Sequence, residues 1–272
     1  MFCKTKNLYA CLILMLVLLS STVLVTPVLA AGIPVNTVTD EDSNNTDANC
    51  SLREAITAAN NDAAYGGCSA GSGSDTITLP AGTYTLNDQL LVNSTIIING
   101  SNATVQANAS PNTATYRVLE VTGAANLTLN ALTIQHGNCD NNLACTSSEG
   151  NPDDNKGHDG GIFNAGILTL NDSFIANNFS ASGGGGVYQM QGTLVVTGST
   201  FTANAAGGDG GAISGLGVIG VTNSNIVNNA ALSGGGIATS GGTLNVIGSL
   251  FSTNAATGSG GGIWTSGHMT LT

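Results

Sequence analysis

The sequence has few charged residues and few aromatic residues. Only 8 % of its 272 residues are charged and 4 % are aromatic, whereas about 25 % of a typical soluble domain is charged. Basic residues are the scarcest, with five Lys and Arg against 16 Asp and Glu. This composition argues against a nucleic-acid-binding protein, which needs a basic stripe. It also argues against a charge-rich disordered chain, because 42 % of the residues are hydrophobic.

Long apolar runs are missing except near the start, where residues 1–30 are typical of a secretory signal peptide. Lys4 and Lys6 precede an apolar run from Ala10 to Val25, and small residues at the −3 and −1 positions favour cleavage after Ala30. An uncleaved membrane anchor is the alternative. Export predicts a secreted, extracellular or cell-surface protein associated with the outer membrane, with no membrane span left in the mature chain.

Cysteine is also scarce, and four cysteines follow the predicted signal peptide: Cys50, Cys68, Cys139 and Cys145. An even set in an oxidising compartment indicates disulfides. Three pairings are possible, and Cys50–Cys68 with Cys139–Cys145 is favoured because each pair lies within one local segment. A zinc site with four cysteines is the alternative, although the spacings lack a C-x₂-C pair.

Glycine is abundant, with 38 residues, and it marks a repeat from residue 160 onward. Gly-Gly pairs that open each copy recur every 25 or 26 residues, at 160, 185, 210, 235 and 261. An alternating apolar pair such as Leu168/Leu170 follows each start, and alternation is the period of a β-strand. Units this short cannot bury a core alone and must stack. We therefore predict an all-β fold, a right-handed single-stranded parallel β-helix of about 25 residues per rung.

Two inward columns and one polar ladder follow from the repeat. The first predicted buried column is Leu168, Leu194, Ile219, Leu244 and Met269. The second is Phe174, Phe201, Ile226 and Phe251. An Asn stands three residues after each member of the second column, which predicts a ladder of Asn177, Asn204, Asn229 and Asn254. Stacked amides can hydrogen-bond along such a ladder.

The chain divides into two predicted regions after the signal peptide. Residues 31–74 form an N-terminal cap with a capping helix at 51–60, because Ser51 and Glu54 make a capping box. We expect Arg53 and Glu54 to be solvated or paired locally. Residues 75–272 form the β-helix, with a loop insertion at about 137–159 that breaks the repeat. The chain stops within a repeat, so we expect a truncated C-terminal end and self-association through the open last rung.

The segment Cys50-Ser51-Leu52-Arg53-Glu54-Ala55 resembles the CSLREA motif of secreted bacterial β-helix proteins. The later repeats resemble the GGAI and FxxN repeats of chlamydial polymorphic outer membrane proteins. GGAI is intact only at Gly210–Ile213, and FxxN stands at Phe174, Phe201 and Phe251. The resemblance implies a pectin-lyase-like fold, export and an adhesive surface role.

The repeat also suggests a binding face. The aliphatic residues after each Gly-Gly pair are expected inside: Ile162, Val187, Ala212, Ile237 and Ile263. Alternation then places the next residues outward: Phe163, Tyr188, Ile213, Ala238 and Trp264. This column would be an exposed, partly aromatic strip that could bind a glycan or a surface protein. The alternative is that the phase is reversed and the column belongs to the core.

Catalytic groups are sparse. After Gly160 the only acids are Asp172 and Asp209, and no Lys or Arg follows Lys156. We predict no catalytic residues and no cofactor, with Asp159 and Asp209 as weak candidates for structural Ca²⁺. The predicted function is an adhesin-like interaction protein whose partner is a glycan or a protein on a host or neighbouring cell. The alternatives are a carbohydrate-active enzyme, either a polysaccharide lyase or a hydrolase, and a structural stalk.

Overall fold

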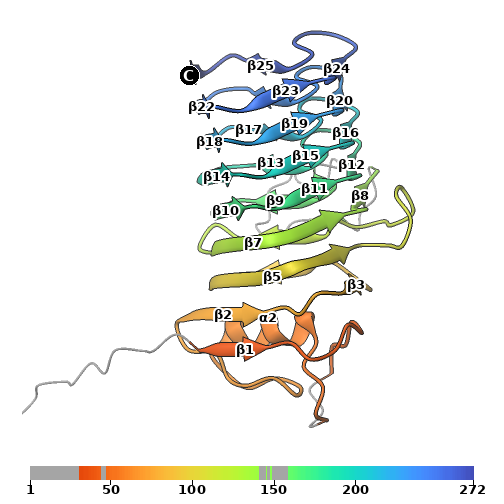
Figure 1. Cartoon of the computed structure of the whole chain (residues 1–272), viewed down its shortest axis with the longest axis vertical. Coiled ribbons are helices and arrows are strands. Elements are labelled where there is room, and N and C mark those ends of the chain that lie inside the picture. The colour runs from red at the N-terminus through yellow and green to blue at the C-terminus, as the bar shows by residue number, and fades with distance from the viewer. Residues whose placement is uncertain (1–30, 44–46, 141–144, 146–147, 149–158) are drawn as a thin grey trace, which may run out of the picture.

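The computed structural model describes residues 31–43, 47–140, 145, 148 and 159–272. The predicted signal peptide at 1–30 and most of the predicted insertion at 137–159 lie outside these residues. Within them, short parallel strands stack into a β-helix whose rungs follow one another along the long axis (Figure 1). No helix in the described ranges is long and apolar enough to span a membrane.

The largest sheet has 14 strands and covers two sides of the β-helix. One arm, here called the first arm, consists of β2 (Ser74–Thr78), β5 (Thr95–Gln106), β7 (Asn126–Gln135), β10 (Ile167–Asn171), β14 (Thr193–Thr197), β18 (Val218–Thr222), β22 (Thr243–Ile247) and β26 (His268–Leu271). The second arm consists of β3 (Thr83–Thr85), β11 (Phe174–Ala176), β15 (Thr200–Thr202), β19 (Asn225–Val227) and β23 (Leu250–Ser252). The long strands β5 and β7 pair with both arms, and β1 (Gly32–Pro34) pairs with β2.

Two further parallel sheets close the coil. The seven-stranded sheet contains β4 (Leu90–Val92), β6 (Leu119–Val121), β9 (Ile162–Asn164), β13 (Val187–Gln189), β17 (Ile213–Gly215), β21 (Ile237–Thr239) and β25 (Ile263–Thr265). The five-stranded sheet contains β8 (Asn138–Cys139), β12 (Phe179–Ser180), β16 (Ala205–Ala206), β20 (Ala230–Ala231) and β24 (Ala255–Ala256). Strand pairing in register therefore stacks equivalent residues of successive repeats.

The first buried column is confirmed over most of its length. Leu168 pairs with Leu194, then Ile219 and Leu244 follow in register, and all four are fully buried. Met269 continues the register but is 43 % exposed, because β26 has no further strand on its outer side. The core is thus a continuous apolar stack that opens at its last rung.

The prediction for the second column is wrong by one residue at its first member. Phe174 pairs with Thr200 and is 51 % exposed, whereas Ile175 pairs with the buried Phe201. Ile226 and Phe251 follow Phe201 in register, with Phe251 only half-buried in the last rung. The repeat here is 26 residues rather than 25, so the F-x-x-N pattern of the first copy is one residue out of phase.

The asparagine ladder shows the same displacement. Asn177 has a φ of 55° and turns the corner, while Asn178 holds the buried ladder position. The Asn178 amide donates to Asn204 Oδ1 at 3.0 Å, and the same contact repeats from Asn204 to Asn229 and from Asn229 to Asn254. The predicted ladder is therefore right for Asn204, Asn229 and Asn254 and wrong for Asn177.

The capping helix is α2 (Leu52–Asn61), and it lies at the N-terminal end of the stack (Figure 1). Ser51 is its N-cap, and Ser51 and Glu54 form the reciprocal capping box. Glu54 is fully buried rather than solvated, while Arg53 pairs locally with Asp40. Both favoured disulfides, Cys50–Cys68 and Cys139–Cys145, are present, which rules out the four-cysteine zinc site.

Candidate functional site

The column predicted as a binding face lies on the seven-stranded sheet. Ile162, Val187, Ile237 and Ile263 share an inward register position, and the residues after them share the outward one. Ile213 is the exception, because it pairs with Val187 and Ile237 and is fully buried. Ser214 takes the outward place. The reason is a 26-residue step from Val187 to Ile213, which leaves the buried Ala212 just before the strand.

The outward residues of this column do not form the exposed strip that the sequence predicts. Phe163 and Ala238 are each only 1 % exposed, and Tyr188 and Trp264 are half-buried. A glycine with positive φ stands four residues before Tyr188, Ser214, Ala238 and Trp264 and packs against each of them. A Cβ on Gly234 would lie 2.8 Å from the Ala238 Cβ, so the glycine-rich turns cover the column.

Phe163 is covered by a buried ionic cluster. The Arg117 guanidinium lies 5.0 Å from the centre of the Phe163 ring, and its Nε is 2.9 Å from Asp159 Oδ1. Glu120 lies 3.6 Å from Arg117 and accepts hydrogen bonds from the backbone N–H and the hydroxyl of Ser148. Arg117 also donates to the carbonyl of Cys145. The cluster therefore ties the residues near the second disulfide to the rung that carries Phe163.

The two weak Ca²⁺ candidates are not brought together. Asp159 has a φ of 58° at the position that glycine holds in the later copies, and its carboxylate faces Arg117. The backbone of Asp159 pairs with Gly183, and that of Gly184 pairs with Asp209, so a full rung separates the two acids. Within the described residues, no group of three or more acidic, His or Cys side chains could hold a metal ion.

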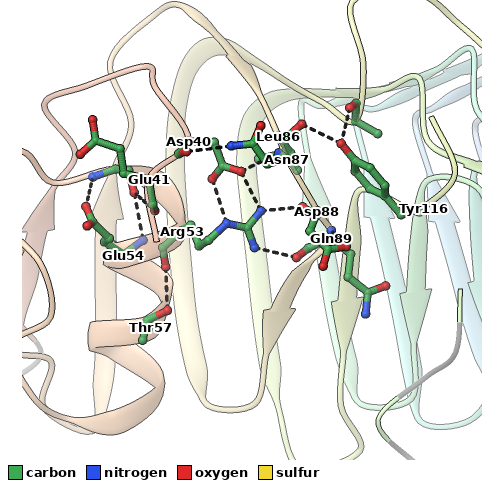
Figure 2. A network of polar contacts seen from close by, with 12 residues as sticks. Asp40, Glu41, Arg53, Glu54, Thr57, Leu86, Asn87, Asp88, Gln89 and Tyr116 are labelled. Atoms are coloured by element: carbon green, nitrogen blue, oxygen red, sulfur yellow. Dashed lines mark hydrogen bonds and ion pairs between the residues drawn. The ribbon is translucent and has the colours of Figure 1, made fainter. Parts of the chain in front are cut away.

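The N-terminal cap is joined to the first rungs by a polar network (Figure 2). Arg53 binds both carboxylate oxygens of Asp40, at 2.9 and 2.8 Å, and donates to the carbonyls of Asp88 and Gln89. Asp40 in turn accepts from the backbone N–H of Asn87 at 2.7 Å. A groove of about 250 Å³ beside α2 is lined in part by Arg53. Because each of the three guanidinium nitrogens already has a hydrogen-bond partner, Arg53 acts here as a clamp between cap and rung.

Tyr116 completes this network on the β-helix side. Its hydroxyl lies 2.7 Å from the carbonyl oxygens of both Leu86 and Ala107 (Figure 2). Burial raises the pKa of Tyr116 above its usual 10.0, and the negative charges of Asp88 and Asp40 add to this effect. Deprotonation would place a phenolate against two carbonyl oxygens, so the neutral form belongs to the folded state.

The outer surface of the first arm is a regular surface whose residues are exposed or half-buried. We call it the threonine face and define it by the outward residues of β10, β14, β18 and β22. These are Ile167, Thr169, Asn171, Thr193, Val195, Thr197, Val218, Gly220, Thr222, Thr243, Asn245 and Ile247. All are uncharged, and the adjacent acid, Asp172, lies beyond the face at the corner that follows β10.

The threonine face is a stiff lattice of methyl, hydroxyl and amide groups. Nine of its twelve residues are β-branched, and β-branched side chains have restricted χ1 angles. Parallel pairing repeats each column at about 4.8 Å. Along one edge, the Asn171 amide donates to Asn130 and the Asn130 amide donates to Asn99, at 2.9 and 2.8 Å. Such a surface can make many hydrogen bonds and apolar contacts at once, with little side-chain entropy to lose.

The sequence analysis predicts the partly aromatic column as the binding face and does not single out this surface. The signal was nevertheless present in the residues between the members of each apolar pair, such as Thr169 between Leu168 and Leu170. In the strand alternation these positions face outward, and none of them is charged in the repeats after residue 160.

No known protein family, curated protein or solved structure matches this chain. The likeness to CSLREA proteins therefore rests on the motif residues themselves.

Proposed function

We propose that this protein is an exported, adhesin-like protein that binds an uncharged polysaccharide through the threonine face and does not cleave it. The observation that carries the proposal is the face itself, a stiff and uncharged lattice that continues over four successive rungs. Secreted, cell-surface localisation follows from the predicted signal peptide and forms part of the proposal.

The chemistry of the threonine face favours a neutral polymer over other partners. Nucleic acids, uronic-acid polymers and anionic membranes bind through cationic side chains, and this face has none. Small ligands bind in concave pockets, whereas the face is a regular sheet surface. A neutral polysaccharide offers hydroxyl groups for Thr169 and Asn245 and C–H surfaces for Val195 and Ile247, repeated along its length.

The first test is adsorption of the exported protein to insoluble polymers. We expect binding to at least one neutral polysaccharide, such as cellulose or chitin, and weaker binding to polygalacturonate. Binding should change little between low and high salt, because no charge pair contributes to it. Release of reducing ends during the incubation would contradict the non-cleaving role. Failure to adsorb to any neutral polymer would contradict the proposed ligand class.

Variants of the threonine face test where the polymer binds. Gly220 lies at the centre of the face, and a Cβ there meets no atom within 4 Å, so Gly220→Glu and Gly220→Thr both fit. We expect Gly220→Glu and Val195→Glu to weaken adsorption at least about tenfold, since each buries a charge against a neutral surface. Gly220→Thr extends the lattice and should bind at least as well as the parent.

The matched controls are Leu216→Glu and Leu232→Glu. Both leucines are half-exposed, like Val218, but they lie outside the first arm. Each control adds the same charge to the molecule, so it should leave adsorption unchanged. Equal losses in the controls and in Gly220→Glu would place the binding surface elsewhere.

A further inference from the structure

A buried carboxylate lies in the first strand of the β-helix, next to the cap. Asp75 of β2 is fully buried and shares a register position with the core residue Ile96. Its Oδ1 accepts a hydrogen bond from the backbone N–H of Ser72 at 2.8 Å. Its Oδ2 is buried and has no hydrogen-bond partner within the described part of the chain. A buried carboxylate without a counter-charge is costly, so this group calls for a cation.

Ala31 lies beside Asp75 and can supply that cation. Its backbone nitrogen lies 3.3 Å from Asp75 Oδ1. Its carbonyl accepts from the Thr76 N–H at 2.8 Å, and the next residue, Gly32, pairs with Thr76 in the parallel β1–β2 ladder. Strand pairing therefore holds the Ala31 nitrogen beside the Asp75 carboxylate.

Ala31 is also the first residue after the cleavage site predicted from the sequence. We propose that the bond between Ala30 and Ala31 is a processing site, and that the α-ammonium group released there pairs with Asp75. A leader-removing endopeptidase would hydrolyse the bond with one water molecule. The hydroxyl of the water goes to the Ala30 carbonyl carbon, and its other hydrogen goes to the Ala31 nitrogen. The resulting amine then binds one proton from solution to become the ammonium.

Processing replaces the Ala31 amide nitrogen beside Asp75 with an ammonium group. An amide nitrogen carries one hydrogen and no charge, whereas an ammonium group carries three donors and a positive charge. The α-amino group has an ordinary pKa of about 7.7–8.0, and an adjacent carboxylate favours its charged form. The ammonium neutralises Asp75 and brings additional donors to its carboxylate. The cap and the first strand thus reach full stability only after the leader has been removed.

The backbone of the loop before β2 packs closely around the Asp75 carboxylate. A Cβ on Gly71 would lie 2.6 Å from Asp75 Oδ2, so the loop before β2 closes tightly on this oxygen. Asp62, a second carboxylate near this loop, accepts from the Gly73 N–H instead. Ala31 itself is half-buried, which is compatible with a chain end at the edge of the cap.

The test compares two exported chains that differ only at the N-terminus. One is processed to begin at Ala31, and the other keeps Gly-Ser before Ala31, so that an amide replaces the ammonium. Both pass through the same oxidising compartment, so both disulfides form. We expect the processed chain to melt roughly 5 °C higher, as expected when a buried charge gains its partner.

Asp75→Asn and Asp62→Asn complete the experiment. Asp75→Asn should lower the Tm of the processed chain, leave or raise that of the extended chain, and abolish the difference between them. Asp62→Asn, the matched control, should preserve the difference. Equal melting of the two parent chains, or a difference that survives Asp75→Asn, would overturn the proposal.

Two readouts do not depend on the folding of the Asp75 variant. The N-terminus of the exported protein should be Ala31, and another start would contradict the site. The α-amine of the processed chain should be acylated at least about tenfold more slowly than that of the extended chain, because its ammonium form is held by Asp75. Equal acylation rates would count against the pair. None of these outcomes depends on polysaccharide binding, so this inference and the proposed function can fail separately.

Discussion

Two phenylalanines with the same sequence motif occupy opposite environments. Phe201 lies in the buried column between Ile175 and Ile226, whereas Phe174 points outward from the second arm. Phe201→Ala should lower the free energy of unfolding by about 3–5 kcal/mol, because it leaves a cavity in a closed stack. Denaturant unfolding followed by circular dichroism measures this change.

Phe174→Ala is the matched control for that experiment. It removes the same side chain from an exposed site, and we expect a change within about 0.5 kcal/mol. A large loss for Phe174→Ala together with a small one for Phe201→Ala would show that the register of the second column is wrong.

Tyr116 makes the stability of the fold depend on alkaline pH. Its pKa is raised in the folded state by burial and by Asp88, so the folded protein holds the phenolic proton more tightly than the unfolded chain does. Stability is therefore fully present below pH of about 10 and falls as the pH rises through the folded-state pKa. Unfolding midpoints measured on either side of pH 10 should show this decline.

Tyr116→Phe separates this contribution from the other tyrosines. The variant loses the hydrogen bonding to Leu86 and Ala107, so it should be less stable at neutral pH. Its decline above pH 10 should be shallower than that of the parent. Part of the decline should remain, because burial also raises the pKa of Tyr84. An unchanged alkaline slope in Tyr116→Phe would contradict the assignment.

The cap motif has a structural explanation for each of its six residues. Cys50 forms a disulfide, and Ser51 and Glu54 close the start of α2. Leu52 and Ala55 are buried in the core, and Arg53 joins the helix to the first rungs. The motif thus covers the end of the β-helix, where unpaired strand edges would otherwise be exposed.

Substitution of Arg53 tests how the capping helix is held on the first rungs. Arg53→Ala should cost about 3 kcal/mol, because the Asp40 side chain is nearly fully buried and would lose its positively charged partner. Arg53→Lys should cost less, since it keeps the charge but not the two-pronged contact. Thermal unfolding measures both values. Equal losses for the two variants would mean that the geometry of the guanidinium contact is unimportant.

Much of the fold could be predicted at the element scale because the repeat is regular. Leu168, Leu194, Ile219 and Leu244 follow strict alternation, which fixes their side of the strand. Prediction failed where one repeat gained a residue. At Phe174, Asn177 and Ile213, an adjacent residue could equally well occupy the same position in the repeat. Only the strand pairing decides which residue of each adjacent pair faces inward.

The candidate site was harder to predict than the fold. Outward side chains do not pack in the core, so no regular pattern of residue types marks these positions in the sequence. Burial of the Phe163 column depends on Arg117 and on positive-φ glycines such as Gly234, which are distant or conformational features. The contact between the Ala31 backbone nitrogen and Asp75 joins residues 44 positions apart, so only the strand pairing reveals it.

At the scale of the whole molecule, charge is distributed unevenly. The acids of the cap include Asp40, Glu41 and Asp42, whereas the rungs after residue 160 contain only Asp172 and Asp209. The stack therefore presents a long, nearly uncharged surface whose most regular part is the threonine face. In the proposed function, the charged cap stabilises the end of the β-helix and the uncharged rungs bind the polysaccharide.

The most direct test of this central claim is hydroxyl-radical footprinting of the parent protein with and without a bound neutral polysaccharide. We expect protection of Ile167, Val195, Val218 and Ile247, the exposed aliphatic residues of the threonine face. Leu216 and Leu232, which are equally exposed elsewhere, should remain as reactive as in the free protein. Protection of Leu216, Leu232 or Trp264 with no change on the threonine face would contradict binding through that face.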